Sequence, residues 1–178
     1  MATYDLTAKS TTGVSADSNT NYPSQTNPGA YVLEKELNIA TLVADGTFSN
    51  VTSGDIFQLL EIPANTIVVV AGANVTTAFT GGSATADIDF AAGDDIIDGG
   101  DITSTGYLAA GSNGQTNTIV GSAATTFTQL VSTADTIDVT IAATDTACVS
   151  GVIRVYAVVL DIASQQTGRD EVDRDLLA

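Results

Sequence analysis

Residues 54–80, GDIFQLLEIPANTIVVVAGANVTTAFT, constrain the fold of this chain more than any other stretch. From residue 56 to residue 62, alternate side chains point to opposite sides, which is the period of a β-strand. Pro63 and Asn65 interrupt this run, because proline lacks an amide donor and asparagine tolerates turn geometry. A β-branched run at 66–70 follows and suits a strand buried on both faces. The stretch therefore predicts two strands joined by a tight turn.

The rest of the chain shows the same strand character. A glycine- and aspartate-rich stretch at 93–114 is predicted to be the longest irregular region. The last predicted strand is apolar on both sides, which favours a central place in a sheet. Besides the two strands already described, the predicted strands are 31–43, 85–90, 116–120, 127–131, 135–143 and 148–162.

About eight strands without a long amphipathic helix predict an all-β fold, a single β-sandwich with jelly-roll-like topology. The 178 residues are enough for one domain with a real core. Residues 1–30 are polar and are predicted to form an extended N-terminal arm. The sandwich is then expected to span 31–163, and a charged C-terminal tail to span 164–178.

The charge of the chain excludes several kinds of partner. Its 21 acidic and 5 basic residues give a net charge of −16, which repels nucleic acid and anionic membranes. No run is apolar for long enough to span a bilayer, and the N-terminus lacks the pattern of a signal peptide. Synthesis in a cytoplasm without export by the general pathway is therefore expected.

The absence of histidine argues against an enzyme. Histidine is the usual general base near neutral pH, so no Ser-His-Asp triad or Cys-His pair can form. Nucleotide-binding glycine motifs are also missing. Carboxylate pairs remain, but a sugar-cleaving site needs aromatic platforms, and the chain has no tryptophan. The single cysteine, Cys148, is expected to be a small buried hydrophobe.

An acidic loop is the one candidate metal site in the sequence. Calcium binds six to eight hard oxygens, which a glycine-rich acidic loop can supply, although the spacing is not that of an EF-hand. A solvated acidic loop without a cation is the alternative interpretation, and no other cofactor is indicated. The candidate ligands are Asp94, Asp95, Asp98 and Asp101.

Arg154 is the only charged residue inside the last predicted strand. It is expected to lie near an edge or to point outward. The alternative is an ion pair with an acidic residue across a subunit interface.

Three segments resemble short virion structural proteins of marine tailed bacteriophages, particularly cyanophages. These segments are MATYDLTAKSTTG at the start, the stretch at 54–80 described above, and GVIRVYAVVLDIA at 151–163. A similar GD…L.IPA.T.V hairpin and an aspartate-rich loop recur in such proteins. The resemblance implies a decoration, cement or knob protein of the capsid, and a homotrimer.

The expected function is therefore a capsid decoration protein that binds the outside of the head and stabilises the shell. Its expected partners are the major capsid protein and other copies of itself, and its expected location is the exterior of the virion. Two alternatives stay open. One is a component of the phage tail or fibre, and the other is a calcium-dependent glycan-binding β-sandwich.

Overall fold

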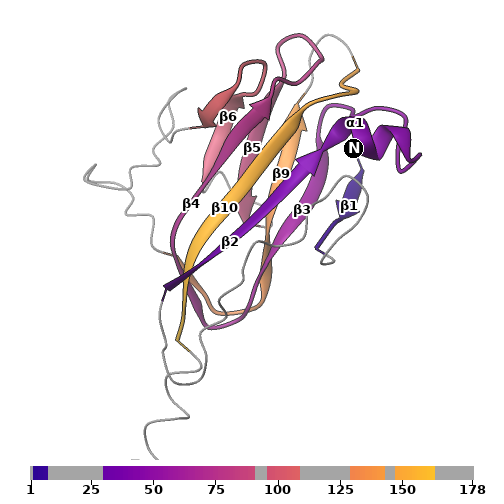
Figure 1. Ribbon diagram of the computed structural model, residues 1–178. Helices are drawn as coiled ribbons and strands as arrows, with labels where there is room; N and C mark the ends of the chain where they lie inside the picture. Colours follow the sequence, from indigo (N-terminus) through magenta and orange to yellow (C-terminus); the bar gives the residue numbers. More distant parts are fainter. Residues whose placement is uncertain (1, 8–29, 91–95, 109–128, 143–146, 163–178) are drawn as a thin grey trace, which may run out of the picture.

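The computed structural model describes residues 2–7, 30–90, 96–108, 129–142 and 147–162, which form two five-stranded sheets packed face to face (Figure 1). Sheet A contains, in spatial order, β1 (Thr3–Asp5), β3 (Asp55–Ile62), β9 (Asp135–Ala142), β5 (Thr85–Phe90) and β6 (Ile97–Asp101). Sheet B contains β2 (Ala30–Asn38), β10 (Val152–Asp161), β4 (Thr66–Thr77) and β7 (Gly106–Leu108), with β8 (Gln129–Val131) also paired to β4. The only helix in this described part of the chain is α1 (Ile39–Ala44).

The strand pairing is that of a jelly roll. If β1 and β8 are set aside, the first of the remaining strands pairs with the last, the second with the second-last, and so on inward: β2 with β10, β3 with β9, β4 with β7 and β5 with β6. Every one of these pairs is antiparallel, and β10–β4 and β9–β5 contacts join them into two sheets. This nested order is the one expected when a long antiparallel ribbon folds over on itself. The prediction of an all-β, jelly-roll-like sandwich is confirmed.

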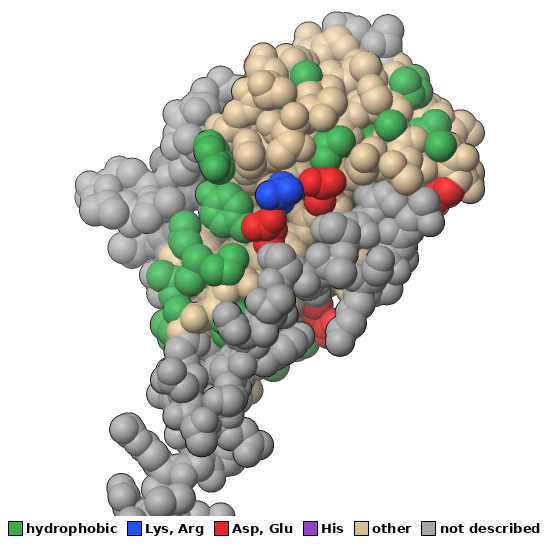
Figure 2. All heavy atoms as spheres, in the orientation of Figure 1, with side chains coloured by type: hydrophobic (Ala, Val, Ile, Leu, Met, Phe, Trp, Pro, Cys, Tyr) green, Lys and Arg blue, Asp and Glu red, His purple; other side chains and the backbone are tan. Residues whose placement is uncertain are grey.

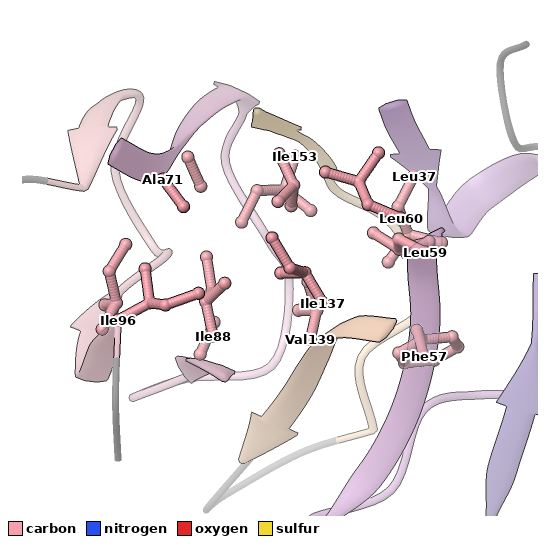
Figure 3. Packing of buried hydrophobic residues seen from close by; sticks show 14 of the residues in the cluster. Leu37, Phe57, Leu59, Leu60, Ala71, Ile88, Ile96, Ile137, Val139 and Ile153 are labelled. Atoms are coloured by element: carbon pink, nitrogen blue, oxygen red, sulfur yellow. The ribbon is translucent and has the colours of Figure 1, made fainter. Parts of the chain in front are cut away.

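The core lies between the two sheets. In Figure 3, Ala71 and Ile153 of sheet B point toward Ile88, Ile137 and Val139 of sheet A, and all of these side chains are buried. Residues facing the core alternate with residues facing outward along β5 and along residues 152–160 of β10, as the period of a strand requires. β10 lies between β2 and β4, so its predicted central place is also confirmed.

The turn at residues 63–65 does not close a hairpin. Asn65 adopts a φ of 59°, as expected for a turn asparagine, but β3 belongs to sheet A and β4 to sheet B. The turn therefore carries the chain from one sheet to the other. The predicted alternation along β3 also fails after Gln58, because an irregularity in its pairing with β9 leaves Leu59 and Leu60 both fully buried.

Two other segments differ from the sequence-based expectation. The strand predicted at 31–43 ends at Asn38, whose side-chain oxygen accepts a hydrogen bond from Thr41 N (3.1 Å) and caps α1. The region 93–114, expected to be irregular, contains the short strands β6 and β7. Both lie at the end of a sheet and are rich in glycine, so neither has a strong strand signal.

Residues 2–7 of the predicted N-terminal arm join the sandwich. β1 pairs in parallel with β3, and Leu6 is buried in the core. The carboxylate of Asp55 accepts hydrogen bonds from Ala2 N (2.7 Å) and from the amide and hydroxyl of Thr52 (both 2.8 Å). Burial raises the pKa of Asp55, but these hydrogen bonds outweigh it and the pKa is lowered. Most of the predicted arm, 8–29, and the predicted tail, 164–178, lie outside the described residues.

Lys35 ties this N-terminal segment to both sheets. Its side chain points inward from β2 and is fully buried, and its Nζ donates to the carbonyl oxygens of Thr7 (3.1 Å) and Leu59 (3.3 Å). A buried ammonium is tolerated only where such acceptors replace water. The sequence does not indicate that Lys35 is buried, because this residue lies between Glu34 and Glu36 and has the pattern of an exposed charged edge.

Candidate functional site: the two outer faces

The outer face of sheet A is acidic. Successive strands place Asp5, Gln58, Asp138 and Asp89 side by side in one row across the sheet. Glu61, Asp87 and Asp101 extend the acidic surface above and below this row. The strands of sheet A contain no lysine or arginine, so no cation from these strands neutralises the face.

Asp138 is the most enclosed carboxylate of this row. Its side chain is 8% exposed, and its Oδ1 accepts a hydrogen bond from the hydroxyl of Thr136 (2.7 Å). Burial raises the pKa of Asp138, and the nearby carboxylates of Asp135 and Asp5 raise it further, against the effect of hydrogen bonds from Thr136 and Gln58. The charged form of Asp138 is therefore less favourable in the folded protein than in the unfolded chain.

Replacing Asp138 with asparagine should stabilise the fold at neutral pH. Asparagine carries no charge, so the cost of burying the carboxylate and its repulsion from Asp135 and Asp5 are removed, and relief of like-charge contacts across a sheet is worth roughly 0.2–1 kcal/mol. The folded pKa lies above the unfolded one, so the destabilisation by Asp138 is full above the folded pKa and is lost progressively as the pH falls from the folded pKa to the unfolded one. Melting of D138N and wild type between pH 4 and pH 8 should show a difference that shrinks toward acid. A difference that is constant with pH would contradict this assignment.

The proposed calcium ligands are only partly described. Asp94 and Asp95 lie outside the described residues. Asp98 and Asp101 are exposed on β6, and the Asp101 carboxylate accepts hydrogen bonds from the hydroxyl (2.6 Å) and amide (2.8 Å) of Thr103, which lower its pKa. Within the described residues, no group of three or more acidic, histidine or cysteine side chains is arranged to hold a metal ion. A calcium site at the four aspartates stays a prediction.

The outer face of sheet B is mainly apolar. On this face Val158 of β10 lies between Val32 of β2 and Val70 of β4. Leu160 and Ile67 form the neighbouring row, with Leu130 of β8 opposite Ile67. Large exposed fractions are found for Val32 (47%), Leu130 (56%) and Tyr107 of β7 (75%). Contiguous apolar surface of this kind is typical of interaction sites.

The aromatic side chains of this face lie at its centre and edge. Tyr156 of β10 lies over Gly72 of β4, where a Cβ atom would come within 2.7 Å of the tyrosine hydroxyl. Burial raises the pKa of Tyr156, and neighbouring Tyr107 adds to the shift. Tyrosine combines a large apolar area with one polar group, which makes it a frequent anchor of interfaces.

A small charged group crosses the apolar face. Arg154 pairs with Glu34 (Nε to Oε1, 3.1 Å) and with Glu36 (Nη2 to Oε2, 3.3 Å), both on the adjacent β2. Figure 2 shows this face, with one basic side chain between two acidic ones and apolar side chains gathered beside them. Arg154 points outward as expected, on a central strand, and its acidic partners belong to the same chain. The sequence predicts that Arg154 points outward, but it does not predict the apolar face, because strands far apart in the chain form this face.

Two negative findings complete the site. Cys148 is fully buried, and burial raises the pKa of its thiol, which disfavours the reactive thiolate. Among the described residues, no helix is both long and apolar enough to cross a membrane.

No protein-family model matches this sequence, and no curated protein matches it. Among solved structures, the chain is similar to one from the structure titled "Capsid of Ralstonia phage GP4". The sequences are 17% identical, the TM-score is 0.48, and the match covers 89% of this chain and 97% of that chain. A likeness of this degree carries no argument about function.

Proposed function

We propose that this protein is a structural component of a tailed-phage virion, which decorates the outer surface of the head and stabilises the shell. The sequence resemblance to virion proteins of marine phages led to this hypothesis. The observation that carries it is the division of the sandwich into one acidic and one mainly apolar outer face. A subunit of a shell needs such a division, since one surface must contact protein while another contacts solvent.

The fold is compatible with this role. Jelly rolls occur in viral capsid and lectin domains and in cupins, and the same fold hosts many functions. Cupin-type metal chemistry relies on histidine, which this chain lacks. We therefore propose a binding role without catalysis. The major capsid protein is the proposed partner on the head, and the exterior of the virion is the proposed location.

The oligomeric state and two alternative functions stay predictions. The resemblance implies a homotrimer, whereas the charges on the two outer faces favour a different arrangement of copies, described below. A tail or fibre component would use the same two-faced sandwich in fewer copies. A calcium-dependent glycan-binding module would depend on the acidic loop, of which Asp98 and Asp101 are described without a completed ligand set.

The decisive experiment is to count copies of this chain in purified virions by quantitative mass spectrometry, with the major capsid protein as internal standard. A decoration protein should be present in hundreds of copies per particle. Limited proteolysis of intact virions should then cleave this chain before the major capsid protein, because it lies outside. A handful of copies would place it in the tail or at one vertex, and its absence from virions would overturn the proposal.

A further inference from the structure

The outer face of sheet B is broad enough to be an interface. Adjacent strands are about 4.8 Å apart and rise about 3.3 Å per residue, so the strands of sheet B together cover roughly 600 Å². Two such faces in contact would bury roughly 1,200 Å², at the lower end of the range for specific protein–protein interfaces. Its centre carries Tyr156 and valines, the side-chain types that suit the dry middle of an interface.

Charge decides which partner this face accepts. Each copy of the chain carries a net charge of −16, so two copies repel unless they meet through surface of low charge. Two copies would repel each other if they associated through the outer face of sheet A, since the charged residues of its strands are all acidic. On the outer face of sheet B, the charged residues among those described are Arg154, Glu34 and Glu36, and they already pair with one another.

We propose that the outer face of sheet B is covered by the same face of a second copy of this chain, in a pair related by a twofold axis. An axis parallel to the strands, between β10 and β4, lays β10 of one copy over β4 of the other and keeps each row of side chains opposite the same row. Val158 of one copy then lies over Val70 of the other, and the ion pairs of Arg154 with Glu34 and Glu36 stay within each copy. The acidic faces of sheet A point away from each other on the two outer sides.

This arrangement makes three side chains central to the pair. Val158 of β10 and Val70 of β4 lie in the middle of the apolar row, and Tyr156 lies in the next row. Such an interface is self-complementary, as a twofold contact must be. Association should strengthen with salt, because screening weakens the repulsion between two copies of net charge −16 more than it weakens apolar contact.

The test is the mass of the full chain in solution, measured by sedimentation equilibrium in about 0.15 M and about 1 M NaCl, with Debye lengths of about 8 and 3 Å. Wild type should be a concentration-dependent pair with twice the chain mass of 18.0 kDa, more stable in high salt. Val158→Asp should weaken association by about 100-fold or more, since it buries an unpaired charge. The matched control is Thr140→Asp, an outward position on β9 of sheet A, which should leave the pair intact.

Other results would overturn the proposal. A wild-type monomer at high concentration in both salts would do so, as would a V158D protein that still pairs. A trimer would favour the arrangement implied by the sequence resemblance instead. Circular dichroism checks that V158D is folded, and Val158→Thr, which keeps a β-branched side chain, replaces it if it is not. The copy number in virions is measured separately from the mass in solution. A monomer in solution would therefore overturn the pair and not the virion role, and absence from virions would overturn the virion role and not the pair.

Discussion

Replacing Gly151 with alanine should destabilise this protein by about 2–6 kcal/mol. Gly151 precedes β10 with a φ of 145°, and a Cβ atom built there would overlap the ring of Phe79, which is itself buried. A side chain at this φ is strained by about 1–3 kcal/mol, and overpacking against a buried ring costs about 1–3 kcal/mol more. The sum is a large part of the stability of a typical domain, about 5–15 kcal/mol. Urea unfolding followed by circular dichroism measures the loss.

Gly106 provides a closely matched control for this experiment. It has nearly the same φ, 144°, but a Cβ atom there would meet nothing within 4 Å. Gly106→Ala should therefore lose only the backbone contribution, about 1–3 kcal/mol. If both variants lose the same amount, the contact with Phe79 is not the reason that Gly151 is required.

Replacing Lys35 with methionine should destabilise the fold by about 2–3 kcal/mol. The two side chains are similar in length, but methionine cannot donate to the carbonyl oxygens of Thr7 and Leu59, and hydrogen bonds from a charged group are worth about 1.5–3 kcal/mol. Removing the buried ammonium also removes its desolvation cost, which keeps the loss below that of breaking a buried ion pair. The measurement is the free energy of unfolding of wild type and K35M at one dilute protein concentration.

The Lys35 prediction has a local signature as well. Hydrogen exchange of β1 amides should accelerate in K35M more than exchange in β9, because Lys35 holds the segment that follows β1. Arg154→Met is the control, since the Arg154 ion pairs are partly exposed and worth about 0–1 kcal/mol. Unchanged exchange in β1 would mean that Lys35 does not anchor the N-terminal segment.

Only individual residues of the candidate site could be predicted from the sequence, and not their arrangement on the two outer faces. The sequence contains the outward arginine and the many aspartates, and it excludes histidine chemistry. It does not show that Asp5, Asp138 and Asp89 share one row, because these residues come from β1, β9 and β5, which are far apart in the chain. A face of a sheet is assembled by strand pairing, and single-strand periodicity reports only which residues of one strand lie on the same side.

By itself the sequence determined the class of the fold, most of the strands, the turn at residues 63–65 and the strongly negative charge. These follow from local rules: alternation along a strand, β-branched side chains, and proline and asparagine in turns. Only the tertiary structure decided that β3 and β4 belong to different sheets, that the N-terminus forms β1, and that Lys35 is buried. The physical reason is that each of these features depends on contacts between distant segments, whose free energy has no counterpart in the pattern of any one segment.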